Sequence, residues 1–211
     1  MTKEDFIKFA SQGNSRVSVN KVIKNFEGSP LQVYKTLNNK NSFLFESASN
    51  KGKWSRYSII GTESNEMIKV EDNKISYIND NKVEEIKTND PLDWIEKFYS
   101  KNKVINLPND VPFSGGLVGY FGYETIRFIE NKLKVEKKDS LGVPDIFLFV
   151  CNEIIIFDNL KKCIHIIINA KTNNEDSYEN SIESHRYDDD YFLSIICKCW
   201  YLLRFTEGVV V

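Results

Sequence analysis

The 211-residue sequence contains few of the residues that form disulfides, bind transition metals or interrupt secondary structure: four cysteines, two histidines and five prolines. The cysteines form no CxxC pair and no apolar leader segment precedes them, so we expect reduced thiols in a cytoplasmic protein. They are Cys151, Cys163, Cys197 and Cys199. Because His165 lies inside an apolar segment and no histidine has partners at metal-ligand spacing, the sequence predicts no metal site.

The sequence also lacks a charge excess and a long apolar run. Its 28 Lys and Arg residues against 30 Asp and Glu residues give a formal net charge of −2, so we expect no nucleic-acid partner. The longest apolar run near the end, from Tyr191 to Leu203, is interrupted by Lys198 and falls short of the roughly 20 residues of a membrane span. What is present is 41% hydrophobic residues, including many aromatics, which predicts a globular core and small polar metabolites as partners.

Local patterns predict three helices. Apolar residues among charges predict a short amphipathic helix over residues 1–12 that ends at Gly13. A cap at Ser29 followed by proline predicts a helix over residues 30–37. Its buried stripe is expected to comprise Leu31, Tyr34 and Leu37. An Asp-Pro pair and helical spacing of apolar residues predict a further helix over residues 91–101.

Strand patterns occupy much of the remaining sequence. Residues 67–87 contain three short segments separated by Asp and Asn turns, which predicts an antiparallel meander. The segment GGLVGYFGYETIR, residues 115–127, lacks the spacing of a dinucleotide-binding loop, and we expect a buried, bent strand with close backbone approach. The segments 153–158 and 163–170 predict a hairpin. The sequence therefore predicts an α+β fold with mostly antiparallel sheets and a few flanking helices, and a further helix beginning within residues 171–183.

The stretch from Ser42 to Gly61 carries the candidate ligand site. Three apolar residues stand side by side in SFLFES, which predicts a strand buried on both faces. Glu46 and Ser47 end this strand, where a carboxylate needs donors or water. Two interpretations remain open: the pair binds a ligand, or Glu46 forms an ion pair with Arg56 across the turn and Ser47 begins the loop.

Five segments in order resemble the N-terminal domain of anthranilate synthase component I over roughly residues 30–170. They are SFLFES, WSRYSIIG, GGLVGYFGYETIR, DSLGVPD and EIIIFDNLKKCIHIIINA. Aminodeoxychorismate synthase component I is a close relative that shares much of this string. SFLFES is similar to the LLES element that binds the feedback inhibitor L-tryptophan in anthranilate synthase, which favours that family.

The resemblance implies a tryptophan-binding role for Ser47, Glu46, Phe45 and Leu44. Glu46 would accept a hydrogen bond from the ammonium group of the amino acid, beside an apolar slot for its indole. Phe45 stands where the family has a second leucine. Its ring either occupies space that the indole needs or points into the core.

The resemblance also implies which parts of the family this sequence does not contain. Residues 1–185 correspond to the regulatory domain, and residues 186–211 are expected to be an aberrant or truncated tail from a shifted reading frame or a truncated gene product. The Mg²⁺-dependent conversion of chorismate to anthranilate belongs to a C-terminal domain, so we expect no catalytic residue and no cofactor in this chain. The family implies a glutamine amidotransferase component II as partner. A non-catalytic tryptophan-binding module is the alternative, and either form is expected to expose an apolar face where the catalytic domain would pack.

Overall fold

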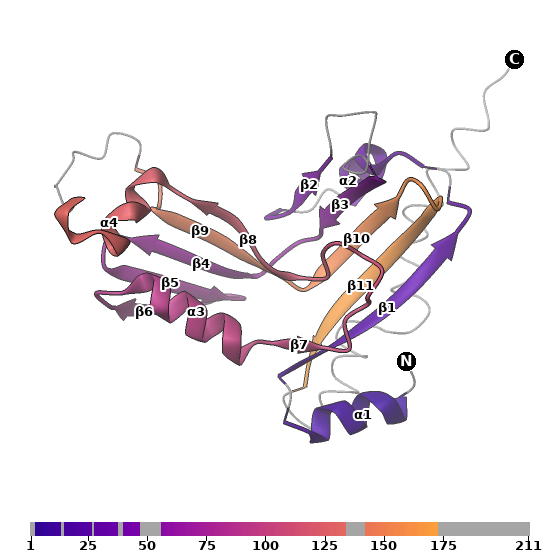
Figure 1. The fold of residues 1–211 in the computed structure, drawn as a ribbon, viewed down its shortest axis with the longest axis horizontal. Coiled ribbons are helices and arrows are strands. Elements are labelled where there is room, and N and C mark those ends of the chain that lie inside the picture. The colour runs from indigo at the N-terminus through magenta and orange to yellow at the C-terminus, as the bar shows by residue number, and fades with distance from the viewer. Residues whose placement is uncertain are drawn as a thin grey trace, which may run out of the picture. The chain divides into compact units, whose positions relative to one another are not determined.

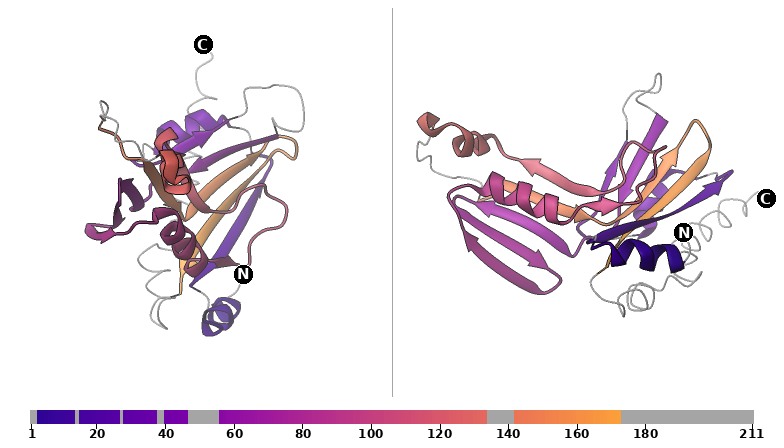
Figure 2. Two further views of the ribbon diagram at one scale, coloured as in Figure 1. Left: turned by 60° about the vertical axis from the view of Figure 1, so that its left-hand side comes forward. Right: turned by 60° about the horizontal axis from the view of Figure 1, so that its bottom comes forward.

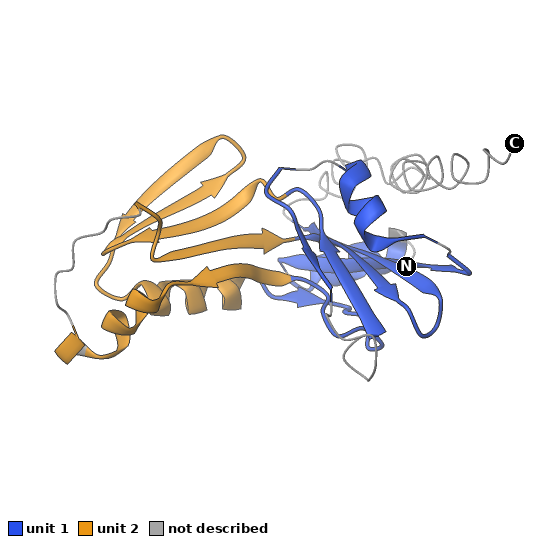
Figure 3. Ribbon diagram, turned by 90° about the horizontal axis from the view of Figure 1, so that it is seen from above, with its two compact units in different colours: residues 1–63, 103–115, 152–211 blue, residues 64–102, 116–151 orange. Residues whose placement is uncertain are grey.

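The structure is a computed structural model that describes residues 3–13, 15–26, 28–37, 40–46, 56–133 and 142–172 (Figure 1). The chain forms two compact units, drawn in different colours in Figure 3. Unit 1 contains residues 1–63, 103–115 and 152–211, and unit 2 contains residues 64–102 and 116–151. Each unit has its own sheet, and the predicted α+β class with antiparallel sheets is confirmed.

Unit 1 is built on a six-stranded sheet with the order β2-β3-β10-β11-β1-β7. All neighbouring strands are antiparallel except β1 and β7, which are parallel. The strands are β1 (Arg16–Lys24), β2 (Phe43–Phe45), β3 (Tyr57–Gly61), β7 (Val104–Ile105), β10 (Glu153–Asp158) and β11 (Cys163–Lys171). The predicted hairpin is β10 and β11, which occupy the centre of the sheet and are buried on both faces along most of their length.

Among the described residues of unit 1, two helices pack on the sheet. Helix α1 (Lys3–Ser11) contributes Phe6 to a small core with Val17 and Ala170. Helix α2 (Pro30–Leu37) covers the main core of isoleucines from β10 and β11. Both helices were predicted from their start and stop signals, and Gly13 follows the first with a φ of 77° that suits glycine.

The buried stripe of α2 differs from the prediction. Val33 and Leu37 are buried, at 2% and 8% exposure, whereas Leu31 is 43% exposed. Tyr34 is half-buried, and its hydroxyl lies 3.4 Å from the Ser42 carbonyl oxygen. Leu37 and Tyr34 both face the core as predicted, and the correction concerns Leu31, whose place in the buried stripe is taken by Val33, four residues before Leu37.

Unit 2 contains a five-stranded antiparallel sheet with the order β6-β5-β4-β9-β8. Helix α3 (Pro91–Lys101) lies along one face of this sheet (Figure 2). The strands are β4 (Glu66–Glu71), β5 (Lys74–Asn79), β6 (Lys82–Lys87), β8 (Gly116–Phe121) and β9 (Ile146–Cys151). Three short helical segments follow β8: η2 (Tyr123–Thr125), α4 (Ile126–Ile129) and η3 (Asn131–Leu133).

The meander and α3 confirm their predictions from local sequence. The turns between β4, β5 and β6 place Asp72 and Asp80 at a φ of 53°, a left-handed conformation that aspartate and asparagine tolerate better than most residues. Helix α3 begins after Asp90, whose side-chain oxygen accepts a hydrogen bond from the backbone N–H of Asp93 at 3.0 Å. Short-range signals were sufficient here because each turn and cap is satisfied by neighbouring residues.

Strand β8 corrects the prediction of a buried strand. It lies at the edge of its sheet, and Tyr120 and Phe121 are 41% and 55% exposed. The predicted close backbone approach does occur, since a Cβ at Gly119 would overlap the carbonyl oxygen of Phe147 on β9. The glycine therefore reflects contact with the neighbouring strand and not burial.

Every helix within the described residues is too short or too polar to cross a membrane. The helix expected to begin within residues 171–183 and the boundary expected at residue 185 lie beyond residue 172, outside the described residues.

Candidate functional site

The candidate ligand site lies at the hairpin formed by β2 and β3. Phe43 pairs with Gly61, Leu44 with Ile60, and Phe45 with Ile59. Strand β2 is only three residues long and forms one edge of the six-stranded sheet, so the prediction of a strand buried on both faces is wrong. The consecutive apolar residues belong to an edge strand that has one face packed on the core and the other face accessible to solvent.

The structure separates the predicted site residues. Leu44 packs against the core cluster that contains Ile60. Phe45, on the opposite face, is 55% exposed, and its ring lies 4.7 Å from that of Phe43. Glu46 is exposed at the end of the strand, and Ser47 lies outside the described residues. The larger ring at position 45 therefore does not enter the core, and Phe45 and Glu46 remain accessible.

Gly61 makes room for the aromatic pair. It lies directly opposite Phe43 in the register, and a Cβ at this position would overlap the Phe43 ring. The missing side chain lets the Phe43 ring lie flat on the neighbouring strand. Phe43 can then stack beside Phe45 on the open face.

Arg56, which begins the return segment of the hairpin, contacts Asp158 and not Glu46. Its Nε donates to Asp158 Oδ1 at 2.9 Å, and its terminal nitrogen donates to Oδ2 at 2.6 Å. The Asp158 side chain is fully buried, while that of Arg56 is 29% exposed. The alternative in which Glu46 forms the ion pair with Arg56 is therefore wrong, because a carboxylate 102 residues away occupies both donors.

Asp158 also organises the turn between β10 and β11. Its Oδ1 accepts hydrogen bonds from the backbone N–H groups of Leu160 at 3.1 Å and Lys161 at 3.0 Å. The N–H of Asn159 donates to the Arg56 carbonyl oxygen at 2.8 Å. Burial alone would raise the pKa of Asp158, but the hydrogen bonds from Arg56 and the turn outweigh it and hold the pKa below its usual value. The carboxylate is therefore ionised at neutral pH.

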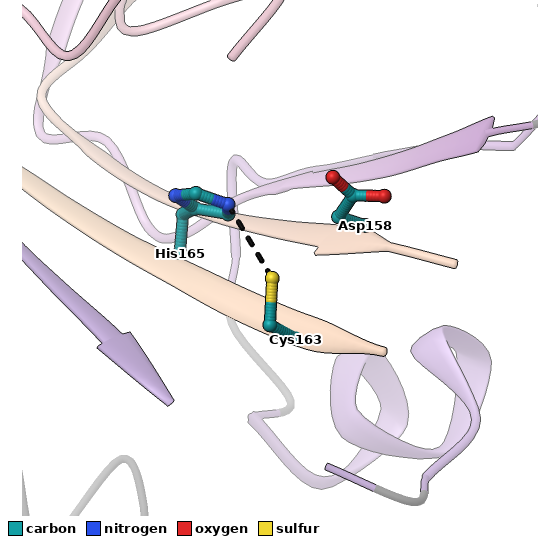
Figure 4. A group of neighbouring side chains, drawn as sticks. All are labelled: Asp158, Cys163 and His165. Atoms are coloured by element: carbon teal, nitrogen blue, oxygen red, sulfur yellow. Dashed lines mark hydrogen bonds between the residues drawn. The ribbon is translucent and has the colours of Figure 1, made fainter. Parts of the chain in front are cut away.

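Sequence reasoning missed the cluster of Asp158, Cys163 and His165, shown in Figure 4. The two paired strands place all three on one face, and Cys163 Sγ lies 3.6 Å from His165 Nε2. The Cys-x-His spacing was the available signal, because residues two apart on a strand share a face.

The cluster contains donor types that bind zinc, but its protonation state and partners oppose this use. Both oxygens of Asp158 are bound to Arg56, and burial together with the Asp158 charge raises the pKa of the Cys163 thiol. A cation would have to displace the guanidinium and the thiol proton. The thiol is 7% exposed and protonated, so it is also a poor nucleophile.

No protein-family model matches the sequence. The chain is 37% identical over 183 residues to anthranilate synthase component 1 of Pseudomonas putida, a match that covers 85% of this chain and 37% of that protein. It is 33% identical over 188 residues to anthranilate synthase component 1 of Neisseria meningitidis serogroup B, covering 87% and 38%. A crystal structure of anthranilate synthase component I from Streptococcus pneumoniae TIGR4 matches with a TM-score of 0.48 and 24% identity, covering 77% of this chain and 35% of that one.

The fold and the hairpin define an α+β protein with two mostly antiparallel sheets and a hairpin at a sheet edge, whose first strand is followed by an exposed carboxylate. The sequence relatives identify it further: the chain is a homologue of anthranilate synthase component 1 and belongs to that family. It spans just over a third of the length of the relatives that it matches.

Proposed function

We propose that this chain is the L-tryptophan-binding regulatory part of an anthranilate synthase component I. The relatives named above support the family, and the β2–β3 hairpin supports the site. The observation that carries the proposal is the position of Glu46, an exposed carboxylate directly after an accessible aromatic pair on an edge strand.

The chemistry of the hairpin suits an aromatic amino acid. Glu46 offers an acceptor for the ammonium group, and hydrogen bonds to a charged group contribute about 1.5–3 kcal/mol. Phe43 and Phe45 offer an aromatic surface with rings 4.7 Å apart, against which an indole can stack. Ser47 follows Glu46 directly in sequence and adds a hydroxyl that can donate or accept.

The conversion of chorismate to anthranilate, with Mg²⁺, is assigned in this proposal to the part of the relatives that this chain does not span. A glutamine amidotransferase component II and a cytoplasmic location belong to the same proposal. The chain alone is then a sensor without a catalytic site, so incubation with chorismate, ammonia and Mg²⁺ is expected to yield no anthranilate. Measurable anthranilate from the purified chain would contradict this division of roles.

Isothermal titration calorimetry with L-tryptophan tests the site. Glu46→Gln is expected to weaken binding about 10–100-fold, since one charge-assisted hydrogen bond is lost. Ser47→Ala removes a single neutral hydrogen bond and is expected to weaken binding several-fold. Glu84→Gln, at an exposed position on β6 in unit 2, is the matched control and should leave the affinity unchanged.

Two results would overturn the proposal. One is an absence of any heat of binding at saturating L-tryptophan. The other is equal affinity for the wild-type chain and Glu46→Gln, which would place the ligand elsewhere. In the same experiment D-tryptophan should bind more weakly. Its ammonium group and its Cα hydrogen exchange positions, so the ammonium group would point away from the Glu46 carboxylate.

A further inference from the structure

Residues 106–114 connect β7 to β8 and lie over one face of the unit 1 sheet (Figure 1); we name them the strap. Both ends of the strap are tied to the sheet. The Asn106 side-chain nitrogen donates to the Ser18 carbonyl oxygen at 3.0 Å, and the Asn169 side-chain nitrogen donates to the Ser114 carbonyl oxygen at 2.8 Å. Because Ser18 and Asn169 are paired in the register of β1 and β11, the two ends of the strap meet at one point of the sheet.

Between its ends, the strap reaches β3 and the turn after β10, where its contacts are long and exposed. The Tyr57 hydroxyl donates to the Asp110 carbonyl oxygen at 3.4 Å. Lys161 Nζ lies 3.4 Å from Asp110 Oδ2, and both side chains are about half exposed. Exposed ion pairs of this kind contribute little to stability. The buried base of the strap, at Ser18 and Asn169, is therefore its firmer attachment.

The side chains of Ser18 and Asn169 are close neighbours. The backbone N–H of Asn169 donates to the Asn152 carbonyl oxygen at 2.8 Å, away from β1, so Asn169 and Ser18 form a non-hydrogen-bonded pair of the ladder. In such a pair the Cα atoms are about 4.5 Å apart and the side chains are at their closest. The two side chains therefore lie side by side at the base of the strap.

Each of these side chains keeps a polar atom that is buried and unpaired. Ser18 is 0% exposed and Asn169 is 3% exposed. Among the described residues, neither Ser18 Oγ nor Asn169 Oδ1 has a hydrogen-bond partner. The amide oxygen can accept two hydrogen bonds, and the hydroxyl can donate one and accept others. Since native folds leave few buried polar atoms unpaired, the pair requires a small third group.

The charges around the pair decide which group fits. Arg16, two residues before Ser18 and on the same face, is 2% exposed and donates to Asn152 Oδ1. Lys171 is the register partner of Arg16. Two cationic side chains beside the pair oppose a metal ion or an ammonium ion. The amide oxygen of Asn169 accepts hydrogen bonds only, so it opposes an anion. A small neutral molecule that both donates and accepts is left, and water has this chemistry.

We propose that Ser18 and Asn169 bind a buried water molecule at the base of the strap. The water donates one hydrogen bond to Asn169 Oδ1 and forms a second with Ser18 Oγ. Buried waters make about three hydrogen bonds, mostly to groups that the protein leaves unpaired. Asn169 then holds Ser114 through its nitrogen and the water through its oxygen, so one amide joins the strap, the water and the sheet.

Oxygen-17 magnetic relaxation dispersion on the purified chain tests the proposal, because it counts water molecules that stay bound for longer than the protein takes to tumble. Ser18→Val places methyl groups where the hydroxyl and the water lie, and we expect it to remove one long-lived water from the wild-type count. Asn20→Val is the matched control, since Asn20 is exposed, two residues further along the same strand and on the same face. It should leave the count unchanged.

Circular dichroism checks that each variant folds. If Ser18→Val does not fold, Ser18→Ala takes its place. The water then keeps its bond to Asn169 but loses one neutral hydrogen bond, so its residence time should fall about 5-fold. A crystal structure of the wild-type chain should show a water within about 3.2 Å of Ser18 Oγ and of Asn169 Oδ1.

The proposal is overturned if Ser18→Val leaves the count of long-lived waters unchanged, or if Asn20→Val lowers it equally. An unchanged residence time in Ser18→Ala has the same meaning. A crystal structure in which Ser18 Oγ donates directly to Asn169 Oδ1, or in which an ion lies between them, also overturns it. All of these measurements are made without L-tryptophan, so their failure leaves the proposal for the β2–β3 hairpin standing, and the reverse also holds.

Discussion

Replacement of Asp158 by asparagine should destabilise unit 1 and reveal how much the buried carboxylate contributes. The wild-type side chain accepts two hydrogen bonds from Arg56 and two from the turn at Leu160 and Lys161. Asparagine keeps one oxygen for the turn. Its NH₂ group, however, takes the place of the second oxygen. This NH₂ group and the Arg56 guanidinium are both hydrogen-bond donors, so no hydrogen bond forms between them.

The magnitude follows from burial and from the number of contacts. Removing one partner of a buried ion pair costs about 3–5 kcal/mol, and hydrogen bonds to charged groups contribute about 1.5–3 kcal/mol. The Asp158 side chain has no exposure, but water reaches the Arg56 side chain, which is 29% exposed. Water can therefore solvate the Arg56 guanidinium after it loses its partner, and we expect Asp158→Asn to lower the free energy of unfolding by about 2–4 kcal/mol.

The effect should depend on pH with a defined sign. The pKa of Asp158 is lowered in the folded protein, below the unfolded value of about 3.9. The ionised carboxylate therefore stabilises the fold above the unfolded pKa, and this contribution is lost as the pH falls through the folded-state pKa. The stability difference between wild type and Asp158→Asn should be full at pH 7 and should shrink as the pH falls below about 4.

Amide hydrogen exchange at pH 7, read by mass spectrometry, locates the effect, and urea unfolding between pH 7 and pH 3 measures its pH dependence. Protection should fall in peptides from β10 and β11 and stay unchanged in the β4–β6 meander. Asp110→Asn is the control in the same unit, since its ion pair with Lys161 is exposed and should contribute less than about 1 kcal/mol. A change below about 0.5 kcal/mol for Asp158→Asn at pH 7 would refute the reasoning.

Two further predictions concern β8 and the buried thiol. Gly119→Ala should destabilise unit 2 by about 1–3 kcal/mol, measured by urea unfolding, because the added Cβ overlaps the Phe147 carbonyl oxygen. Ser76→Ala on the same sheet is the control. An equal loss of stability in both variants would contradict the proposed overlap at Gly119. Cys163 should react with iodoacetamide at pH 8 at least about 10-fold more slowly in the folded protein than in urea, since burial and Asp158 raise its pKa; equal rates by peptide mass spectrometry would mean that the site is open.

Local sequence signals correctly predicted the elements whose caps and turns are formed by residues close to them in the sequence. Asp90 caps α3 by accepting a hydrogen bond from the backbone N–H of Asp93, and Asp72 and Asp80 lie in turns between adjacent strands. Residues close in sequence therefore determine the conformation of these elements. The hairpin of β10 and β11 belongs to the same category. These elements do not depend on which distant strand pairs beside them.

The errors concern position within a sheet, which local composition does not encode. Strands β2 and β8 are both apolar, yet each lies at an edge of its sheet. Among the described residues, no strand pairs with its outer side. The same limit applies to the ion pair. Arg56 had a nearby carboxylate in Glu46, but the fold brings Asp158 against it from 102 residues away, and no spacing rule identifies that partner.

For the candidate site, the residue pattern alone identified Glu46 and Ser47 as a candidate ligand pair, and the family resemblance added Phe45, Leu44 and the tryptophan-binding role. Sequence reasoning missed the cluster at Cys163 and His165, because the third member, Asp158, joins through cross-strand pairing. Which face of β2 each residue occupies also required the register with β3, since a shift of one residue exchanges the faces.

The strand order of unit 1 sets the sequence in which a growing chain can fold. Strands β10 and β11 lie between β3 and β1, so the first strands made have their main partners among the last. Roughly 110 residues separate Gly61 from Lys171, and synthesis at about 5–20 residues per second leaves an interval on the order of 5–20 s. During that interval Val17 and Ile60, both fully buried in the finished fold, are without the strands that cover them. The five strands of unit 2 are all made before β10 and β11, so the complete sheet of unit 2 can form before the two central strands of the unit 1 sheet exist.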